Sequence, residues 1–403
     1  MSVDMNAPEL RFSGYSEKWK VNKFNRLTKI NQGLQIEISN RYTYKVDNSF
    51  FYITNEFLKE SSGYKYFIVN PPASVLCNED DVLMTRTGNT GHVVTNISGA
   101  FHNNFFKINF DRKELDKNFL VHYLKWSKTQ QTILRVAGSS TIPDLNHNDF
   151  YSLKIAYSKI EEQTKVGNTF EKLDSLINQH QQKHDKLSNI KKAMLEKMFP
   201  KEGESIPEIR FKEFSEKWEQ KELDELAEIV RGASPRPIED PKWFDTRSNV
   251  GWLRIRDVTE QDGRIFHLEQ RISRLGQEKT RVLYEKHLLL SIAASVGKPV
   301  VNYVETGVHD GFLIFKKPLF EIEFMYQWLK SFESQWQQYG QPGSQVNLNS
   351  DIVKHQLVYV PSKEEQTAIG DYFQKLDAMI NQHQRQITKL NNIKQACLKK
   401  MFV

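Results

Sequence analysis

Residues 85–92, Thr-Arg-Thr-Gly-Asn-Thr-Gly-His, form a short loop whose side chains are suited to contacting DNA. The loop follows a predicted strand, so these side chains are expected to lie near one another. An arginine can donate two hydrogen bonds to guanine, and an asparagine can bind adenine in the same bidentate way. We therefore expect DNA contacts from Arg86, Thr87, Asn89 and His92; the alternative is a set of solvated surface side chains.

A second group of basic and polar residues lies in the second half of the chain. Residues 231–236, Arg-Gly-Ala-Ser-Pro-Arg, are predicted to be a loop. Residues 252–255 are predicted to be a strand, which would place the side chains of residues 254 and 256 on one face. Because phosphate and sugar take at least half of protein–DNA hydrogen bonds, we expect more of this group to hold the backbone than to read bases. The group comprises Arg231, Ser234, Arg236, Arg254, Arg256 and Lys298.

Motifs for catalysis start in this sequence but are not completed. Residues 70–73 read Asn-Pro-Pro-Ala, where an amino-methyltransferase would have an aromatic residue last, and no glycine-rich cofactor loop precedes them, so they are interpreted as a tight turn after a strand. No phosphate-binding loop of the form Gly-x-x-x-x-Gly-Lys-Ser/Thr occurs. Pro143 and Asp144 could begin a metal-nuclease pattern, but the only Glu-x-Lys, at 219–221, lies far downstream. The sequence thus predicts no catalytic, cofactor-binding or metal-binding residues in this chain.

Composition narrows the class of protein and its compartment. The chain has 403 residues and a net charge of +6, which mildly favours a polyanionic partner. Two cysteines, Cys77 and Cys397, are too few for a zinc site or a disulfide framework and fit a reducing compartment. The first residues contain no apolar signal region, and no run of 18 apolar residues occurs. We expect a cytoplasmic protein without a membrane partner.

Two long helices dominate the predicted structure. Residues 161–199 and 364–402 align without a gap, and 24 of 39 positions are identical by direct count. A helix of this length would span roughly 58 Å. Apolar residues recur at coiled-coil spacing, so we expect the two helices to pack on each other; two ordinary core helices are the alternative. The predicted seam is Phe170, Leu173, Ile177, Leu187, Phe373, Leu376, Ile380 and Leu390.

The start of each helix carries a capping signal. Ser158 precedes Glu161 by three residues, and Ser362 precedes Glu365 by three. This spacing predicts a capping box, in which the serine accepts a hydrogen bond from the amide of the glutamate.

A second repeat shows that the chain is two tandem units. Pro-Glu-Leu-Arg-Phe at 8–12 and Ser-Glu-Lys-Trp at 16–19 return at 207–211 and 215–218. We therefore divide the chain into a first body at 1–157, a helix at 158–199, a second body at 200–360 and a helix at 361–403. The divergent bodies still share features at matching positions, among them Gly91 with Gly297, His102 with His309 and Phe105 with Phe312.

Each body is expected to be a mixed α/β domain around a twisted sheet. Strands are predicted at 50–54, 65–69, 82–85, 92–95 and 105–109, and a helix at 113–128. In the second body, strands are predicted at 252–255, 287–291, 300–304 and 312–315, and a helix at 321–338. Two domains with one fold but different surfaces suit the reading of a bipartite, asymmetric target.

The order of these parts resembles the specificity subunits of Type I restriction–modification enzymes. The resemblance rests on the Glu-Glu-Gln-Thr helices ending in Lys-x-Met-Phe, the Pro-Glu-Leu/Ile-Arg-Phe…Trp openings, and Gly-Ser pairs at 138–139 and 343–344. A proline precedes the second helix at 361, whereas Tyr157 stands at that place in the first. The resemblance covers essentially the whole chain and is most specific in the helices.

The resemblance implies a function and partners. The two bodies would be target-recognition domains on double-stranded DNA, and the helices an antiparallel coiled coil that sets the spacer. Two modification subunits using S-adenosylmethionine, and restriction subunits using ATP and magnesium, would supply the chemistry. The chain itself would then be neither an enzyme nor a cofactor-binding protein. Two alternatives stay open at this point: a tandem scaffold that binds only proteins, and a cryptic nuclease or methyltransferase.

Overall fold

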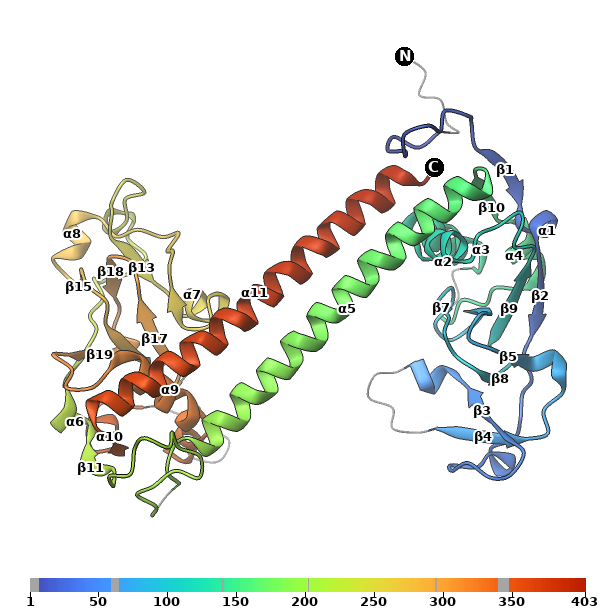
Figure 1. Ribbon diagram of the computed structural model, residues 1–403. Coiled ribbons are helices and arrows are strands. Elements are labelled where there is room, and N and C mark those ends of the chain that lie inside the picture. The colour runs from blue at the N-terminus through green and yellow to red at the C-terminus, as the bar shows by residue number, and fades with distance from the viewer. Residues whose placement is uncertain (1–6, 59–64, 139–140, 202, 294–295, 340–347) are drawn as a thin grey trace. The chain divides into compact units, whose positions relative to one another are not determined.

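The structure is a computed structural model that describes residues 7–58, 65–138, 141–201, 203–293, 296–339 and 348–403. It divides into two compact units, each considered by itself. Unit 1 comprises Met1–Gln181 and Arg385–Val403, and unit 2 comprises Gln182–Gln384. Each of the two long helices, α5 (Ile160–Lys197) and α11 (Lys363–Met401), is divided between the units, with one part in unit 1 and the other part in unit 2 (Figure 1).

Unit 1 contains two four-stranded sheets and one two-stranded sheet. The strand orders are β2-β9-β6-β7, β4-β3-β8-β5 and β1-β10. All neighbouring strands are antiparallel except β3 and β8, which are parallel. With the short helices of this unit, this confirms the predicted mixed α/β domain. The strands are β1 Lys20–Lys23, β2 Thr28–Gln32, β3 Ser49–Ile53, β4 Tyr66–Val69, β5 Leu76–Cys77, β6 Val82–Thr85, β7 Val93–Val94, β8 Gly99–Phe101, β9 Phe105–Phe110 and β10 Lys154–Tyr157. The short helices are α1 Phe24–Leu27, α2 Lys117–Lys125, α3 Ser127–Val136 and α4 His147–Ser152.

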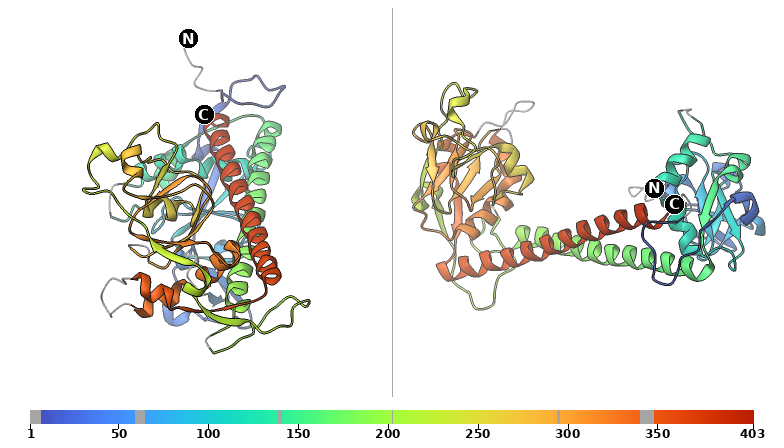
Figure 2. Two further views of the ribbon diagram at one scale, coloured as in Figure 1. Left: turned by 90° about the vertical axis from the view of Figure 1, so that its left-hand side faces the viewer. Right: turned by 90° about the horizontal axis from the view of Figure 1, so that it is seen from above.

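Unit 2 repeats this plan with a different distribution of strands. Its sheet orders are β12-β19-β16-β17-β14, β13-β18-β15 and β11-β20. The strands are β11 Glu219–Glu222, β12 Glu228–Arg231, β13 Gly251–Leu253, β14 Arg264–Ile265, β15 Arg281–Leu283, β16 Leu288–Ser291, β17 Pro299–Asn302, β18 Thr306–Val308, β19 Phe312–Lys316 and β20 Leu357–Val360. The helices are α6 Leu223–Leu226, α7 Ile255–Glu260, α8 Arg274–Gln277, α9 Ile322–Phe332 and α10 Ser350–Lys354. In each unit the sheets and the long-helix halves enclose apolar cores, and Figure 2 shows the same elements in two further views.

The strand pairs that occur in both units have the same register. Ile30 pairs with Ile108 on β2 and β9, as Ile229 pairs with Phe315 on β12 and β19. Parallel strands β3 and β8 in unit 1 correspond to β13 and β18 in unit 2. The predicted correspondences of Gly91 with Gly297, His102 with His309 and Phe105 with Phe312 are confirmed. The match of Gly88 with Ala294 and that of the Gly-Ser pairs include residues outside the described ones.

The helix predicted at 113–128 is wrong at both ends. The side chain of Asp116 accepts a hydrogen bond from the amide of Phe119 at 2.9 Å, and this cap starts α2 at Lys117. An extended Trp126 then separates α2 from α3. The helix predicted at 321–338 is α9 followed by a short 3-10 helix, Glu333–Tyr339.

The two long helices pair in opposite directions within each unit, as expected from the resemblance. In unit 1 the rings of Phe170 and Phe402 stack with centroids 5.5 Å apart, and in unit 2 Phe199 and Phe373 stack at 6.2 Å. Of the predicted seam, Phe170 and Phe373 are fully buried. The remaining seam residues are buried or partly buried on the same helices: Leu173, Ile177, Leu187, Leu376, Ile380 and Leu390.

The two sequence repeats in each unit bind to each other. Arg11 forms a bidentate pair with Glu162 at 2.7–2.8 Å, and Arg210 forms the matching pair with Glu365 at 2.6–2.7 Å. Both glutamates are 1% exposed. The following Gln163 accepts a hydrogen bond from the amide of Asp116 at 3.0 Å, which ties α5 to the start of α2. The opening repeat and the Glu-Glu-Gln motif are thus two sides of one buried contact.

The predicted capping boxes are only partly present. Ser362 accepts a hydrogen bond from the amide of Glu365 at 3.4 Å. The prediction for Ser158 is wrong, because α5 begins two residues later, at Ile160, and the Ser158 hydroxyl bonds to the carbonyl of Lys159. In each helix the second glutamate, Glu162 or Glu365, binds an arginine. It is therefore not available to accept a hydrogen bond from the backbone amide at the start of its helix.

A buried histidine gives unit 1 a pH-dependent stability. His122 on α2 is 3% exposed, and burial lowers its pKa to about 4 despite Asp174 nearby. The unfolded chain, with a histidine pKa near 6.5, binds a proton that the folded unit does not, so stability falls as the pH drops from 6.5 towards 4. We expect a loss of about 2 kcal/mol between pH 6.5 and 4.5 that is absent in His122→Phe. Urea unfolding of the wild type and of His122→Phe at pH 6.5 and 4.5 measures this difference in the free energy of unfolding. An equal pH dependence of the two proteins would contradict the prediction.

Candidate nucleic-acid interface

Four segments meet at one end of the sheets in each unit, and we call this region the turn surface. In unit 1 it comprises residues 32–35, Asn55, the loop 85–92 and the turn 102–105. The amide of Arg86 donates to the carbonyl of Asn104 at 2.7 Å, and Asn55 Nδ2 donates to the carbonyl of Thr87 at 2.9 Å. In unit 2 the corresponding segments are residues 231–236, 254–256, the described parts of 291–298, and the turn 309–312. There the amide of Ile292 donates to the carbonyl of Gly311 at 2.8 Å.

A histidine shapes the central turn in both units. The carbonyl of His102 accepts from the amide of Phe105, and that of His309 accepts from the amide of Phe312. The ring nitrogen Nδ1 of His102 accepts from the amide of Asn104 at 3.2 Å, and Nδ1 of His309 accepts from Gly311 at 2.9 Å. Burial lowers the pKa of both histidines, which favours the neutral ring that can accept.

A glycine brings the first segment against this turn. A Cβ on Gly33 would overlap the carbonyl oxygens of Phe101 and His102, and one on Gly232 would overlap the carbonyl oxygen of His309. Only glycine permits this approach of two backbones. The residues on either side of the glycine are therefore held beside the turn in both units.

The loop that follows β6 is held by its own side chains. Arg86 pairs with Asp144 at 2.7 Å, and its guanidinium lies over the ring of Phe106 at 5.7 Å from the centroid. The side chain of Arg86 is 19% exposed, whereas Asn89 is an exposed residue. Within this loop, Arg86 holds the loop to Asp144, and Asn89 is exposed at the surface.

The turn of unit 1 gathers three amide side chains. Gln32 Nε2 donates to the carbonyl of Asn103 at 3.2 Å, and Asn103 Nδ2 donates to Gln35 Oε1 at 3.0 Å. Among the described residues, Asn103 Oδ1 is buried and accepts no hydrogen bond. This group is neutral and offers both donors and acceptors.

The turn of unit 2 gathers three of the predicted residues on Asp310. Arg231 Nε donates to the carbonyl of Asp310 at 2.6 Å, while the hydroxyl of Ser234 and an amino group of Arg236 donate to its carboxylate at 2.7 and 2.6 Å. Burial alone would raise the pKa of Asp310, but the hydrogen bond from Ser234 and the charge of Arg236 outweigh it and lower the pKa. One arginine on the carboxylate of Asp310 and a second on its backbone carbonyl leave more positive than negative charge among these side chains.

The prediction of Arg254 and Arg256 on one strand is wrong. Strand β13 ends at Leu253, and Arg254 caps α7, which begins at Ile255. The backbone amide of Arg254 and its guanidinium all donate to the buried carboxylate of Asp257, which starts the helix there. The two arginines still lie near each other, because both pair with Glu269, at 3.6 and 2.8 Å.

His92 and Lys298 lie at the equivalent exits of the two loops. Gly91 and Gly297 before them both have φ near +90° and donate their amides back to Thr85 and Ser291. Burial and the charge of Lys125 lower the pKa of His92. Lys125 ends α2, so His92 faces that helix as well as the loop. These two residues are therefore less closely grouped with the turn than the others.

The sequence reading missed the residues around the turns themselves. Gln32, Gln35, Asn103 and Asp310 were not among the expected contacts. The signal was present, because the offset of 199 residues that relates the opening repeats continues without a gap to Gly33 and Gly232.

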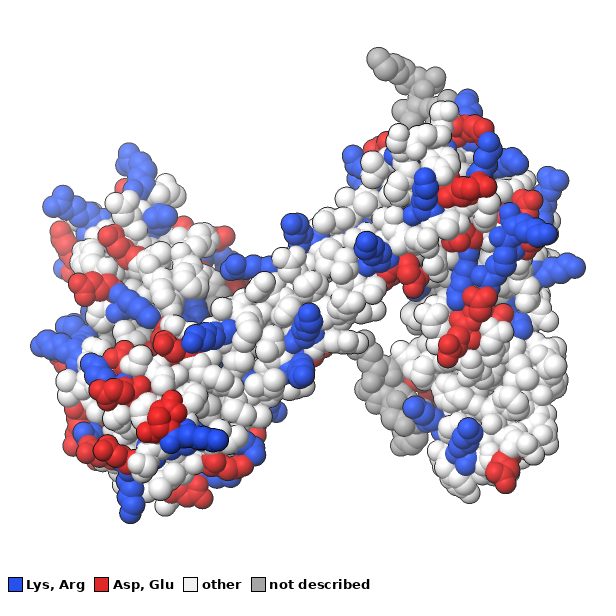
Figure 3. Space-filling view, in the orientation of Figure 1, with Lys and Arg blue, Asp and Glu red and all other residues white. Residues whose placement is uncertain are grey.

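The face visible in Figure 3 mixes Lys and Arg with Asp and Glu on both units. Opposite charges also pair directly in the described part of the chain, as at Arg256–Glu260. The excess of basic residues does not form one continuous basic face in this view. Contacts to phosphate from this face would therefore come from separate basic groups and not from one continuous basic surface.

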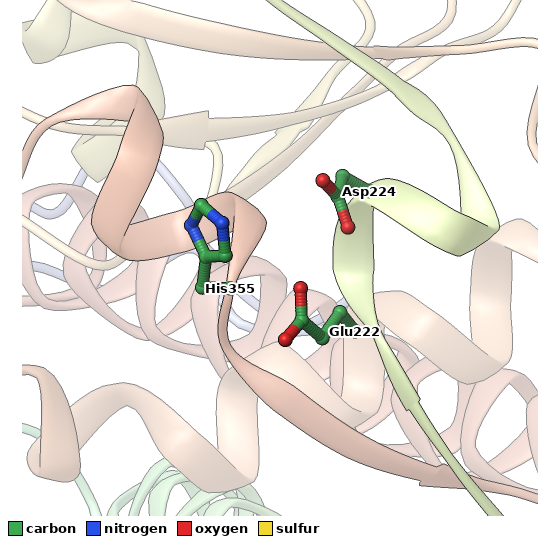
Figure 4. Close-up of side chains that lie close together, drawn as sticks. All are labelled: Glu222, Asp224 and His355. Carbon is green, nitrogen blue, oxygen red and sulfur yellow. The ribbon is translucent and has the colours of Figure 1, made fainter.

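A cluster of Glu222, Asp224 and His355 has the composition of a metal site, and none of the three belongs to the turn surface (Figure 4). One ligand atom from each residue lies within 4.8 Å of the others. Asp224 and His355 are exposed, and His355 Nδ1 already contacts the carbonyl of Asp351 at 2.8 Å. In unit 1 the matching positions carry a lysine, an asparagine and a serine. The cluster is thus no shared feature of the two units, and we assign it no metal.

Comparisons with known proteins identify the family. The model of the Type I restriction modification DNA specificity domain matches residues 16–189 and again residues 215–392. The chain belongs to this family. This match confirms the resemblance to a specificity subunit that the repeated helices and the repeated openings indicated.

Individual relatives agree with this assignment. The specificity subunit of the Type I restriction enzyme MjaVIII from Methanocaldococcus jannaschii is 22% identical over 356 residues, which cover 82% of this chain and 79% of that protein. The crystal structure of the S subunit from M. genitalium matches with a TM-score of 0.62 at 17% identity, covering 98% of this chain and 99% of that one. A chain from a structure on complex assembly and conformational transition of the type I R-M system matches with a TM-score of 0.52 at 17% identity and similar coverage. These structural matches support the fold, and the family match supports DNA recognition.

No helix in the described part of the chain is long and apolar enough to cross a membrane.

Proposed function

We propose that this chain reads a bipartite, asymmetric DNA site, with one half-site bound by each unit. The observation that carries the proposal is the duplication of one fold with different side chains at the same turn: amides in unit 1 and arginines around Asp310 in unit 2. The match of the DNA specificity family to both halves supports it. Two readers with different side chains would give two different half-sites.

The helices α5 and α11 would set the spacer between the half-sites. Each helix begins among residues of one unit and ends among residues of the other. A helix is a stiff element of defined length, whereas a flexible linker would leave the separation variable.

The chemistry would reside in partner proteins. Two modification subunits would bind S-adenosylmethionine and methylate adenine, and motor-nuclease subunits would use ATP and magnesium. This chain would be a non-catalytic cytoplasmic subunit that recruits them. The incomplete catalytic motifs of the sequence support this division.

Co-expression with the products of neighbouring genes, followed by mapping of methylated bases in the host DNA, tests the proposal. We expect adenine methylation at a bipartite motif, each half of which changes when the matching body is exchanged. A stable complex without any new methylation would favour a protein-binding scaffold. Methylation or cleavage of DNA by the isolated chain would show an enzyme instead.

A further inference from the structure

The turns of the two units place side chains at equivalent positions in equivalent contacts. The matched register of β2 with β9 and of β12 with β19 makes Gln32 equivalent to Arg231. Both side chains donate to the backbone carbonyl of the turn residue, Asn103 or Asp310. The side chain of the turn residue also contacts the residue three positions after Gln32 or Arg231. This residue is Gln35 in unit 1 and Ser234 in unit 2. The contacts are conserved between the units while the chemistry of the side chains changes.

In unit 1 this arrangement leaves an acceptor and a donor free. With Nε2 of Gln32 on the carbonyl of Asn103, the Oε1 atom of Gln32 has no hydrogen-bond partner among the described residues. With Oε1 of Gln35 bound to Asn103, its Nε2 is equally without a partner there. Glutamine amides that present one acceptor and one donor match the N6 donor and N7 acceptor of adenine in the major groove.

In unit 2 the same arrangement leaves guanidinium forks free. Arg231 contacts the carbonyl of Asp310 through Nε, so its two terminal amino groups have no partner in the described part of the chain. The side chain of Arg236 is 71% exposed and uses one amino group on Asp310. Paired N–H donors from arginine match O6 and N7 of guanine. Asp310 is a positioning residue, because it holds both arginines and Ser234 without itself offering a free donor.

We infer that these matched side chains determine base specificity: Gln32 and Gln35 select adenine in the half-site of unit 1, and Arg231 and Arg236 select guanine in that of unit 2. The inference rests on the proposed function and assigns it to named residues. One fold can then read two sequences, because the side chains at the turn differ between the units while the backbone around them is the same.

Exchange of the groups between units tests the inference. The full chain carries either Q32R/Q35S/N103D in unit 1 or R231Q/S234Q/D310N in unit 2, and each variant is co-expressed with the neighbouring modification subunit for methylome mapping. We expect a change at one adenine position of the first half-site, or at one guanine position of the second, with the other half-site unchanged. Asn25→Arg is the control for an added arginine, because it places one on α1, before β2, whereas Gln32 ends β2; its motif should equal that of the wild type.

Single substitutions test the inference if a triple variant does not fold. Gln32→Ala and Arg231→Ala remove only side-chain atoms at partly or fully exposed residues. In binding titrations of the assembled complex against single-base variants of the mapped site, each should relax discrimination at one position by about 5- to 150-fold. An equal loss at every position would place the residue on phosphate and overturn the inference, as would full methylation of an unchanged motif by both triple variants. A wild-type complex that methylates no bipartite motif would overturn the proposed function and the inference with it.

Discussion

Replacing Glu162 with glutamine is expected to destabilise unit 1 by about 3 kcal/mol. The carboxylate is almost fully buried and accepts two hydrogen bonds from Arg11 and a third, at 3.3 Å, from the indole of Trp19. A glutamine offers two N–H donors where the site supplies only donors, and it leaves the guanidinium of Arg11 without its counter-charge in a mostly buried place. Breaking a buried ion pair from one side is among the largest effects of a single substitution.

Hydrogen exchange of the full chain separates this effect by unit. Peptides of β1 and β10 should lose about two orders of magnitude of protection in Glu162→Gln, while β11 and β20 stay as in the wild type. Glu365→Gln should give the reverse pattern, and a smaller loss, because Trp218 Nε1 has no partner among the described residues and does not reach Glu365. The neighbouring Glu161→Gln and Glu364→Gln are matched controls at exposed positions. If Glu162→Gln exchanges like Glu161→Gln, the buried pair does not stabilise the unit.

This pair shows how far the sequence alone could lead. The repeats at 8–12 and 161–163 were visible as repeats, and their duplication predicted two equivalent domains. Their physical role was not visible, because the arginine and the glutamate of one pair are 151 residues apart. A capping box was the only local explanation for the Glu-Glu-Gln motif. In both helices the second glutamate instead binds an arginine far along the chain, and of the two predicted serine caps only that of Ser362 is present.

The strands show the same limit. Apolar runs such as Val82–Thr85 were predicted with the observed bounds, because they are buried on both sides and need no partner to be recognised. β1 and β10 were missed, because their sequences are mixed and only pairing with a segment far along the chain makes them strands. The strand predicted through Arg254 failed because Asp257 supplies a cap three residues on and turns the chain into a helix.

The candidate contacts divide along the same line. The loop at 85–92 and the residues Arg231, Ser234 and Arg236 were found from residue type, and the structure places each set in one location. Gln32 and Asn103 were missed because they lie outside the candidate loops, and only the repeated glycine at positions 33 and 232 pointed to them. Only the close approach at Gly33 brings them together, and the steric need for a glycine there depends on the backbone of His102.

Lengthening both long helices by seven residues should lengthen the spacer of the recognised site and leave both half-sites unchanged. The insertions belong between residues 181 and 182 in α5 and between 384 and 385 in α11, where the chain passes from one unit to the other. Seven residues add about 10 Å to a helix and turn it by nearly two full turns, so the apolar faces stay aligned within about 20°. At about 3.4 Å per base pair, the spacer should grow by up to about three base pairs, and the original site should no longer be methylated.

Methylome mapping of the co-expressed complex reads both the half-sites and the gap. The control is an insertion of seven glycine and serine residues after Gly203, before Glu204 and Ser205. It lengthens the chain in a loop and leaves both helices as they are. That control should keep the original motif. A changed half-site with an unchanged gap would show that the helices do not set the spacing. A longer gap in the loop control would assign the spacing to the connection after α5 and not to the helices themselves. A new gap only in the helix variant, with both half-sites intact, would separate the two tasks of this chain: the turns of each unit select the bases, and the length of the helix pair selects the distance between them.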